Sequence, residues 1–440
     1  MKKVSAIWFS VFINCLLFLS APAQEVTANY HLFEGKTIYK IVIVGNVSTK
    51  ESVIKREMKT KVGDILISNK LQQDRKRIQN LQLFTRVEIY PTESGNGQVG
   101  LVVWVAERWH FFPYPLLFRN ERTWDKWSYG AGFMHNNIRG MNNRLLAELW
   151  LGYNPGGQLS YYNPWFGGKH NLYYKLIVHS MKIKSRTLQI PERFDELRRG
   201  ATFTLGKRWG YHTFSSLLFA YEKIAYPDRY KRFLPSETGR QNVATAGFEV
   251  IFDTRDLYEY TRKGWYIDAY ATQSYLTKQL NYIMYGFDLR YYFPLSKQIS
   301  FASRCTIDLS HGTVPLFSNY YLGYSERIRG HFYEQREGDS RMIFSGEIRF
   351  PLLPIQYLDL NSSYLMVGQY SRDLPFGVSA AVFYDVGMIG YRKNRDSLDI
   401  LSGFGVGLHF HLPYVELLRI EYAFDWEVNG QIIIDTKVAL

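Results

Sequence analysis

The sequence predicts a mainly β protein, in which a small N-terminal α+β region precedes a transmembrane antiparallel β-barrel of about 16 strands. Three observations support this prediction. After Arg108 the helical spacing of apolar residues gives way to a period of two. The alternating runs place charged residues on one face and large apolar residues on the other. Beyond the N-terminal 23 residues, no apolar run reaches the roughly 18 residues that a membrane-spanning helix needs.

The N-terminus has the three parts of a secretory signal. Met1-Lys2-Lys3 supplies positive charge, an apolar run extends from Val4 to Leu19, and Ala21-Pro22-Ala23 follows with small residues. We therefore expect residues 1–23 to be a signal peptide that is cleaved after Ala23, and residues 24–38 to be a linker. An N-terminal membrane anchor is the alternative interpretation of this short apolar run.

Charge and cysteine content exclude several functions. The chain has 53 lysines and arginines against 40 aspartates and glutamates, a formal net charge of +13. Because an exported chain rarely meets nucleic acid, this charge predicts a cationic lumen or lipid-facing rim and no nucleic-acid partner. Cys15 lies within the signal, which leaves Cys305 as the one thiol of the mature chain. We therefore expect no internal disulfide, no cysteine-based metal site and no reaction at Cys305.

The region 39–108 reads as strand, helix, helix, strand, strand. A β-branched run begins at Tyr39, and Ser48-Thr-Lys-Glu51 predicts a capping box at the start of the first helix. A second helix follows from about Ser68, and a Gly95-Asn-Gly97 turn then joins two strands as a hairpin. The two helices are expected to bury Val53, Ile54, Met58, Leu71, Ile78 and Leu81, and to leave Arg75, Lys76 and Arg77 largely solvated.

From residue 109 to residue 440 the chain is a series of alternating runs separated by Gly, Asn, Pro and Asp. In the run 143–151, leucines and an alanine face one way, while Arg144, Glu148 and Trp150 face the other. A soluble β-sandwich also alternates, but its interior face would not combine so many charges with so apolar an outer face. The runs 341–350 and 418–426 repeat the split, with Arg341, Glu347, Arg349, Arg419, Glu421 and Asp425 on the charged face.

The lengths of the connections predict how the barrel is oriented. Long polar insertions at 183–198, 227–242 and 312–339 alternate with shorter turns, as expected if the long ones face outside. The chain would then enter the barrel from the periplasm. The stretch 354–375 is also long, although it falls on the periplasmic side, and the sequence gives no reason for it.

Two sets of motifs carry a family resemblance. The first set is Val44-Gly45-Asn46, Gly63-Asp64, Leu81-Gln-Leu83-Phe84 and the closing Val-Ala-Glu107-Arg108, and with the order of elements it resembles a POTRA domain. In the barrel, the chain resembles the BamA/TamA superfamily of outer-membrane assembly and translocation proteins, also called the bacterial surface antigen family. The barrel motifs are Phe252-Asp253-Thr-Arg255-Asp256, Lys263-Gly264-Trp265, Ile328-Arg329-Gly330-His331, Phe383-Tyr-Asp385-Val-Gly387 and the hairpin from Gly403 to Phe424.

The resemblance implies a site. In that family the loop-motif arginine enters the lumen and pairs with an acidic residue of the wall, here Arg329 with Asp385. The expected site is therefore the loop Ile328, Arg329, Gly330 and His331 with the wall residues Phe383, Asp385 and Gly387. A guanidinium in a partly dehydrated lumen needs a carboxylate to offset its desolvation. The pair either supports the loop or acts directly in translocation.

The chain departs from the family in three respects. His331 stands where the family usually has Phe or Tyr, and the last residue is Leu440 in place of an aromatic one. There is one POTRA-like repeat, whereas general assembly factors usually carry several. A specialised or accessory role in the assembly of other proteins is therefore compatible with the resemblance.

The function that the resemblance implies is outer-membrane protein assembly, insertion or translocation, through substrate capture by the POTRA-like region and lateral opening of the barrel. The expected partners are unfolded outer-membrane protein clients, outer-membrane lipids and periplasmic accessory proteins. A passive, anion-preferring pore is the alternative. An enzyme is not expected, since the chain has no G-x-S-x-G elbow and no H-E-x-x-H helix. No catalytic residue, cofactor or metal is predicted, and His409 and His411 are interpreted as wall residues.

Overall fold

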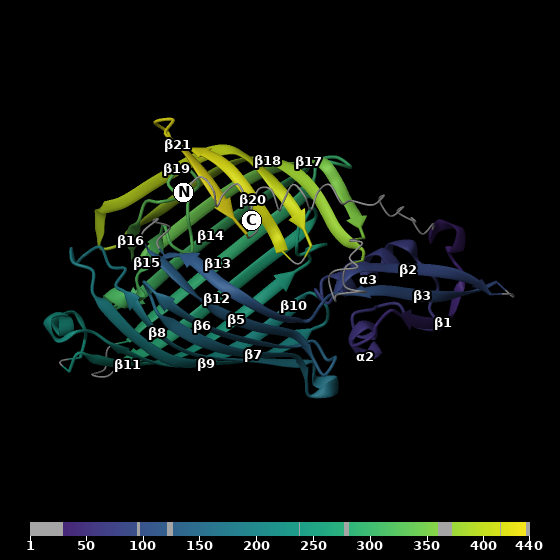
Figure 1. Ribbon diagram of the computed structural model, residues 1–440, viewed down its shortest axis with the longest axis horizontal. Helices are drawn as coiled ribbons and strands as arrows, with labels where there is room; N and C mark the ends of the chain where they lie inside the picture. Colours follow the sequence, from purple (N-terminus) through teal and green to yellow (C-terminus); the bar gives the residue numbers. More distant parts are fainter. Residues whose placement is uncertain are drawn as a thin grey trace.

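The computed structural model describes residues 30–94, 97–120, 126–236, 238–276, 281–359, 372–413 and 415–436. The predicted signal peptide, the start of the linker and Leu440 lie outside these residues. A small three-stranded region sits at one end of a large curved sheet of 16 strands (Figure 1). No helix in the described part of the chain is long and apolar enough to cross a membrane.

The N-terminal region is built around a central strand. β3 pairs in parallel with β1 and antiparallel with β2, and two helices pack against this sheet. Its core includes every residue that the sequence predicted to face inward from the two helices. The elements are the 3-10 helix η1 (Tyr30–Phe33), β1 (Thr37–Val44), α2 (Glu51–Lys55), α3 (Ser68–Gln79), β2 (Phe84–Ser94) and β3 (Gln98–Glu107).

The capping-box prediction for the first helix is wrong. α2 begins after Lys50, whose side chain makes no capping bond. The Glu107 carboxylate, at the end of β3, instead accepts the backbone N–H groups of Ser48 at 2.9 Å and Thr49 at 2.6 Å. A tertiary contact therefore satisfies amides that a local motif was expected to satisfy.

The 16-stranded sheet is antiparallel, and strands consecutive in the chain are neighbours except where a short hairpin, β15–β16, separates β14 from β17. This confirms the predicted fold class. The strands are β4 (Phe111–Arg119), β5 (Trp127–Ile138), β6 (Asn143–Gly152), β7 (Gly156–Phe166), β8 (Leu172–Lys184), β9 (Asp195–Trp209), β10 (Thr213–Ala225), β11 (Arg240–Asp253), β12 (Gly264–Leu276), β13 (Asn281–Pro294), β14 (Ser300–Gly312), β15 (Tyr320–Leu322), β16 (Arg336–Gly338), β17 (Ser340–Leu358), β18 (Leu374–Tyr391), β19 (Asn394–Leu412), β20 (Val415–Phe424) and β21 (Gly430–Asp435). Short 3-10 helices are η3 (Gly168–His170), η4 (Asp228–Phe233) and η5 (Leu316–Ser318).

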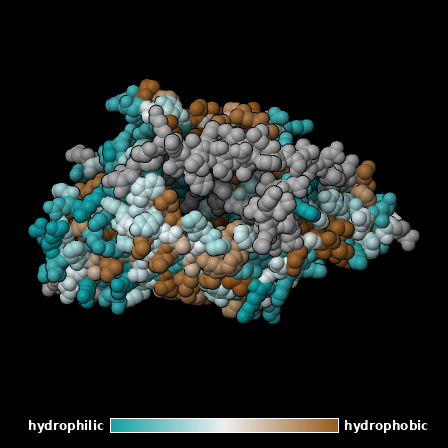
Figure 2. Space-filling view, in the orientation of Figure 1, coloured by the Kyte–Doolittle hydropathy of each residue, from teal (hydrophilic) through white to brown (hydrophobic). Residues whose placement is uncertain are grey.

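The two faces of the sheet differ in the way that the alternation predicts. Leu149, Leu217 and Phe248 are 66%, 47% and 51% exposed on the outer face, whereas Glu347 and Arg349 are buried on the inner face. Hydrophobic residues gather over the middle of the barrel, and hydrophilic ones at the end away from the N-terminal region (Figure 2). The apolar middle fits the hydrocarbon layer of a bilayer.

The stretch 354–375, whose length the sequence left unexplained, is partly accounted for by two long strands. β17 and β18 pair as far as Leu358 opposite Leu374. Next to this pair, the Asp373 carboxylate accepts a bond from the Arg86 guanidinium of β2 at 2.9 Å. Residues 360–371 of this stretch lie outside the described residues. The long strands thus extend toward the N-terminal region and contact it.

The predicted solvated face of α3 lies against the barrel, so that prediction is wrong. The Lys76 ammonium contacts the Asp256 carboxylate at 3.1 Å, in the turn between β11 and β12. Asn80, just after α3, donates to the Asp256 carbonyl at 3.0 Å and accepts the Tyr258 N–H at 3.0 Å. Arg77 is held within the N-terminal region by the Asp74 carboxylate and the Glu57 carbonyl. The basic residues serve packing and docking.

Candidate functional site

The segment between β14 and β17 folds into the lumen and packs against the inner face of the barrel. Tyr320 and Leu322, on β15, join Ile328 in an apolar cluster with Ile343 of β17 and Ile389 of β18. Ile328 is 1% exposed. The cluster fixes the base of the loop that carries the predicted motif.

Arg329 lies at the centre of three carboxylates. Its Nε and Nη2 donate to the two oxygens of Asp385 at 2.7 and 2.8 Å, and its backbone N–H donates to the same carboxylate at 3.2 Å. Nη1 donates to Glu347 at 2.7 Å and to Glu421 at 3.1 Å. The guanidinium also stacks on the Phe383 ring, with Cζ 3.6 Å from the ring centroid. Strands β17, β18 and β20 therefore all hold one side chain of the loop.

Further arginines balance the charge of this cluster. Arg349 donates to Glu347 at 2.6 Å, and Arg419 donates to Glu421 at 2.9 Å. Glu347 and Arg349, like Arg419 and Glu421, are two residues apart on one strand, which puts each pair on the same inward face. Three guanidinium groups thus face the three carboxylates, and this pairing is what permits such complete burial.

Glycines make room for the loop against β19. Gly403 lies opposite Asp385 in the sheet, and a Cβ atom there would overlap the carbonyl oxygen of Arg329. Gly330 has a φ of 101°, and a Cβ on it would lie 2.5 Å from the carbonyl oxygen of Phe424. Gly387 leaves space for the side chain of Ile328. The glycine-rich run of β19 is a hollow that receives the backbone of the loop.

The end of the loop contacts the last strand. The Phe332 N–H donates to the side-chain oxygen of Gln431 at 3.1 Å, and Phe332 packs with Phe383 and with Ile433 of β21. His331 has Nδ1 2.6 Å from a Glu334 oxygen and Nε2 3.1 Å from the Ser402 carbonyl oxygen. His331 therefore makes polar contacts to β19 at the position where the family usually has an aromatic ring.

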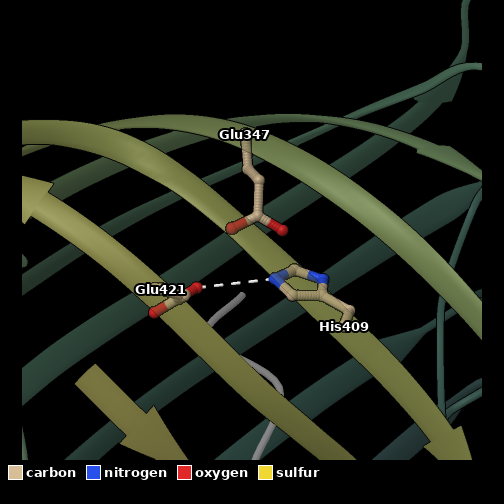
Figure 3. A group of neighbouring side chains, drawn as sticks. All are labelled: Glu347, His409 and Glu421. Carbon is tan, nitrogen blue, oxygen red and sulfur yellow. Dashed lines mark ion pairs between the residues drawn. The ribbon is translucent and has the colours of Figure 1, made fainter. Parts of the chain in front are cut away.

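Glu347, His409 and Glu421 form a group with the spacing of metal ligands. They come from β17, β19 and β20 and point toward one another, with one ligand atom from each lying within 4.8 Å of the others (Figure 3). Both carboxylates already bind arginines, and Nε2 of His409 is 3.5 Å from Glu421. Because a cation would have to displace guanidinium groups, the arrangement does not favour a metal site.

The structure brings the predicted site residues together. Arg329 meets Asp385 and Phe383, and Gly330, His331 and Gly387 line the same contact between loop and wall. Sequence reasoning placed Glu347 and Glu421 on the lumen face but did not assign them to Arg329. Their spacing of two residues from an arginine on the same face was the available signal.

Comparisons with known proteins agree with this architecture. The Omp85 superfamily domain matches residues 137–431, and the POTRA domain, described as a surface antigen variable number repeat, matches residues 36–108. The chain belongs to the Omp85 superfamily. With the apolar outer face of its barrel, it is an outer-membrane protein. The resemblance inferred from the motifs is confirmed.

Two curated relatives are outer membrane protein assembly factors named BamA. That of Nitratidesulfovibrio vulgaris (strain ATCC 29579 / DSM 644 / CCUG 34227 / NCIMB 8303 / VKM B-1760 / Hildenborough) is 22% identical over 438 residues, which cover 94% of this chain and 52% of that protein. That of Neorickettsia risticii (strain Illinois) is 34% identical over 144 residues, which cover 32% of this chain and 19% of that protein. The chain therefore spans about half or less of the length of these relatives.

Two solved structures have a similar fold. BamA from Haemophilus ducreyi lacking POTRA domains 1-3 has a TM-score of 0.54 and 16% identity, over 91% of this chain and 83% of that one. CdiB from Escherichia coli has a TM-score of 0.59 and 11% identity, over 92% of this chain and 75% of that one. At these identities the likeness concerns the fold.

Proposed function

We propose that this protein assembles or translocates other polypeptides at the outer membrane, with its N-terminal region in the periplasm. The observation that carries the proposal is the order of the 16-stranded sheet, which has β4 at one end and β21 at the other. No described residue of one is paired with the other in the sheet. Unpaired strand edges are templates for another strand, so an incoming segment can add to either edge.

The last strand is also the more easily displaced part of the sheet. In the described residues, β21 pairs with β20 from Gly430 opposite Phe424 to Asp435 opposite Arg419, whereas β17 and β18 pair along nearly their whole lengths. Fewer ladder hydrogen bonds give a lower free energy of local opening. Release of β21 from β20 therefore requires less free energy than separation of β17 from β18, which supports the end of the sheet at β21 as the place where a new strand enters.

The N-terminal region supplies a second place for strand addition. Among the described residues, the order β1-β3-β2 places no strand beyond β2 or beyond the second half of β1, whose first half bonds to the backbone of residues 63–66. Tyr39, Val42 and Val44 of β1 are each more than a third exposed. A backbone edge next to exposed apolar side chains suits extended client segments of varied sequence, because main-chain hydrogen bonds supply the affinity.

In this proposal the loop around Arg329 sets the position of the last strand. Arg329 is fixed to β17, β18 and β20, and three residues later Phe332 contacts Gln431 and Ile433 of β21. A change at the loop would therefore reach β21 directly. The site acts by positioning and needs no covalent chemistry.

Charge pairing in the lumen does not favour an anion-selective pore. Arg290 and Arg304 both bind Asp288, and Arg304 also binds Glu326. Arg341 binds Asp308 in the same way. Guanidinium groups that are already neutralised attract anions weakly, so the positive net charge of the chain does not make the lumen an anion filter.

Depletion of the protein tests the proposed function. Quantitative mass spectrometry of outer membranes after depletion should show loss of other barrel proteins, broadly for a general factor and selectively for a dedicated one. An unchanged outer-membrane proteome, combined with ion conductance of the purified protein in planar bilayers, would overturn the proposal in favour of a pore.

Crosslinking tests the lateral opening. Single cysteines along β4 are combined with single cysteines along β21 in a Cys305→Ser background, and an oxidised pair that joins the edges should abolish complementation of the depleted strain until reductant is added. Leu408→Cys with Ile420→Cys is the matched control, since these outward residues are already opposite each other in the paired strands β19 and β20. Full function with β4 and β21 joined would refute lateral opening.

A further inference from the structure

A row of cations crosses four consecutive strands on the outer face of the barrel. Lys182, Arg199, Lys223 and Arg240 lie on β8, β9, β10 and β11, and all four are exposed. Each shares its strand face with lipid-facing residues such as Phe203 and Phe219. We call these four residues the cation row.

The cation row contains a repulsive pair. Arg199 and Lys223 are directly opposite each other in the β9–β10 ladder, and like charges in that position destabilise a sheet. In the described part of the chain, no carboxylate is within ion-pair distance of either residue. Asp195 is the one carboxylate on the outward face of β8 to β11, and it is shared by Lys182 and Lys184 at 2.6 and 2.5 Å. The row thus has a net positive charge that the protein does not balance.

The row lies at the boundary between the apolar band and the polar end of the barrel. One outward position further into the band, roughly 6–7 Å along each strand, the residues are Ser180, Ala201, Tyr221 and Asn242, and the next outward positions are Val178, Phe203, Phe219 and Ala244. Beyond the row the strands end in the polar connections away from the N-terminal region, where Figure 2 shows hydrophilic residues. This is the level of lipid headgroups.

An apolar groove begins beside the row and runs into the band. It has a volume of about 560 Å³, and its lining includes Leu149, Leu151, Leu159, Val178 and Lys182. Gly157 lies between Leu149 and Ser180 in the sheet. Because glycine has no side chain, the surface is recessed at this position and forms the bottom of the groove. The exposed leucines on β6 and β7 form the walls.

We propose that the cation row and this groove bind an anionic lipid, with a phosphate of its headgroup on Lys182, Arg199 and Lys223 and an acyl chain in the groove. A phosphate accepts charge-assisted hydrogen bonds from guanidinium and ammonium groups, and it would offset the repulsion between Arg199 and Lys223. Basic residues beside an apolar surface bind an anionic lipid in two ways, through charge attraction to its headgroup and through apolar contact with its acyl chain. The inference concerns the outer face alone and does not depend on which polypeptides the barrel handles.

The test compares two charge-matched variants of the full chain in lipid nanodiscs. Lys182→Gln/Arg199→Gln/Lys223→Gln removes three charges from the row, and Arg229→Gln/Lys231→Gln/Arg232→Gln removes three from η4, away from the groove. Thermal unfolding is followed in phosphatidylcholine with and without lipid A, a phosphorylated acylated disaccharide. Lipid A should raise Tm by several degrees for the wild type and the η4 variant, and most of that rise should be lost in the row variant.

The Tm measured in phosphatidylcholine alone distinguishes loss of lipid binding from misfolding, because a misfolded variant would have a lower Tm there. Without an anionic lipid the row variant is relieved of repulsion, so its Tm should equal or exceed that of the wild type. A separate variant, Ser180→Leu, fills the groove without changing charge and should reduce the number of lipid A molecules retained in native mass spectrometry. Equal Tm gains for the row and η4 variants, or unchanged lipid retention by Ser180→Leu, would overturn the proposal.

Discussion

The ion pairs that hold the loop in the lumen differ from those that hold the N-terminal region against the barrel. Around Arg329, the arginine and its carboxylate partners are at most 5% exposed. At the boundary between the two regions, the side chains of Lys76 and Asp256 are 35% and 16% exposed, and those of Arg108 and Glu259 are 17% and 39% exposed. The loop set is dry throughout, whereas the boundary set ranges from these partly exposed pairs to the nearly buried pair of Arg208 and Glu57, whose side chains are 13% and 6% exposed.

This difference assigns the two sets different tasks. A buried charge whose partner is removed keeps its desolvation penalty, so the Arg329 cluster specifies one loop position and tolerates little change. Exposed pairs contribute roughly 0–1 kcal/mol each, so the exposed contacts of the boundary are weak individually, and the more buried pair of Arg208 and Glu57 is the strongest of them. The loop should therefore behave as a fixed part of the wall, and the N-terminal region as a part whose docking can be adjusted.

Arg329→Met should have the largest effect. It leaves Asp385, Glu347 and Glu421 with one cation fewer in a buried site, at a cost of about 3–5 kcal/mol. The change should appear as a lower urea midpoint of the folded barrel, read from its heat-dependent mobility in gel electrophoresis.

Arg329→Lys is the control, because it keeps the charge but loses the planar fork that binds Asp385 through two nitrogens. It should fall between the wild type and Arg329→Met. Equal midpoints for all three proteins would show that the cluster does not specify the position of the loop.

Glu57→Gln should have an intermediate effect on docking. Glu57 accepts two bonds from Arg208 of β9, at 2.9 and 3.1 Å, and lies beside Arg56. Burial lowers the pKa of the Arg56 guanidinium to about 10, and the Glu57 carboxylate opposes that shift. Glu57→Gln removes the negative charge that lies beside the guanidinium groups of Arg56 and Arg208. The docking of the N-terminal region should lose about 1.5–3 kcal/mol, which is the usual contribution of a charged hydrogen bond.

Spin labels at Lys40 and Leu295, in a Cys305→Ser background, measure this docking. Their distance distribution should broaden in Glu57→Gln and stay close to the wild type in Lys76→Gln, whose pair with Asp256 is more exposed. If Lys76→Gln broadened the distribution as much as Glu57→Gln did, burial would not be what ranks the contacts at this boundary.

The barrel and its faces could be predicted because a period of two fixes which side chains share a face, whatever the register. The pairing of Arg329 with Asp385 came from family resemblance. The further contacts of Arg329 with Glu347 and Glu421 depend on the register of β17, β18 and β20. The spacing of residues within one strand does not determine that register. The hollow at Gly403 depends on the same alignment.

The two errors in the N-terminal region have one cause. The capping box at Ser48 and the solvated face around Lys76 were inferred from local sequence, and in both places a residue distant in the chain changes the outcome. The Glu107 carboxylate accepts the backbone N–H groups of Ser48 and Thr49, near the start of the first helix, and the Asp256 carboxylate binds Lys76. Local patterns cannot reveal such contacts.

Removal of the Lys36–Glu93 ion pair should have the smallest effect on stability. This pair tests the expectation that exposed ion pairs contribute little. The Lys36 ammonium donates to the Glu93 carboxylate at 2.7 Å, and this bond holds the pKa of Glu93 below its ordinary value of 4.5. A lowered pKa contributes stability that is present above the ordinary pKa and is lost as pH falls through the lowered one. Lys36→Met should return the pKa of Glu93 to its ordinary value in an NMR titration, with no measurable change in the urea midpoint at pH 7. A clear loss of stability at pH 7 would mean that exposed pairs contribute more here than their solvation allows.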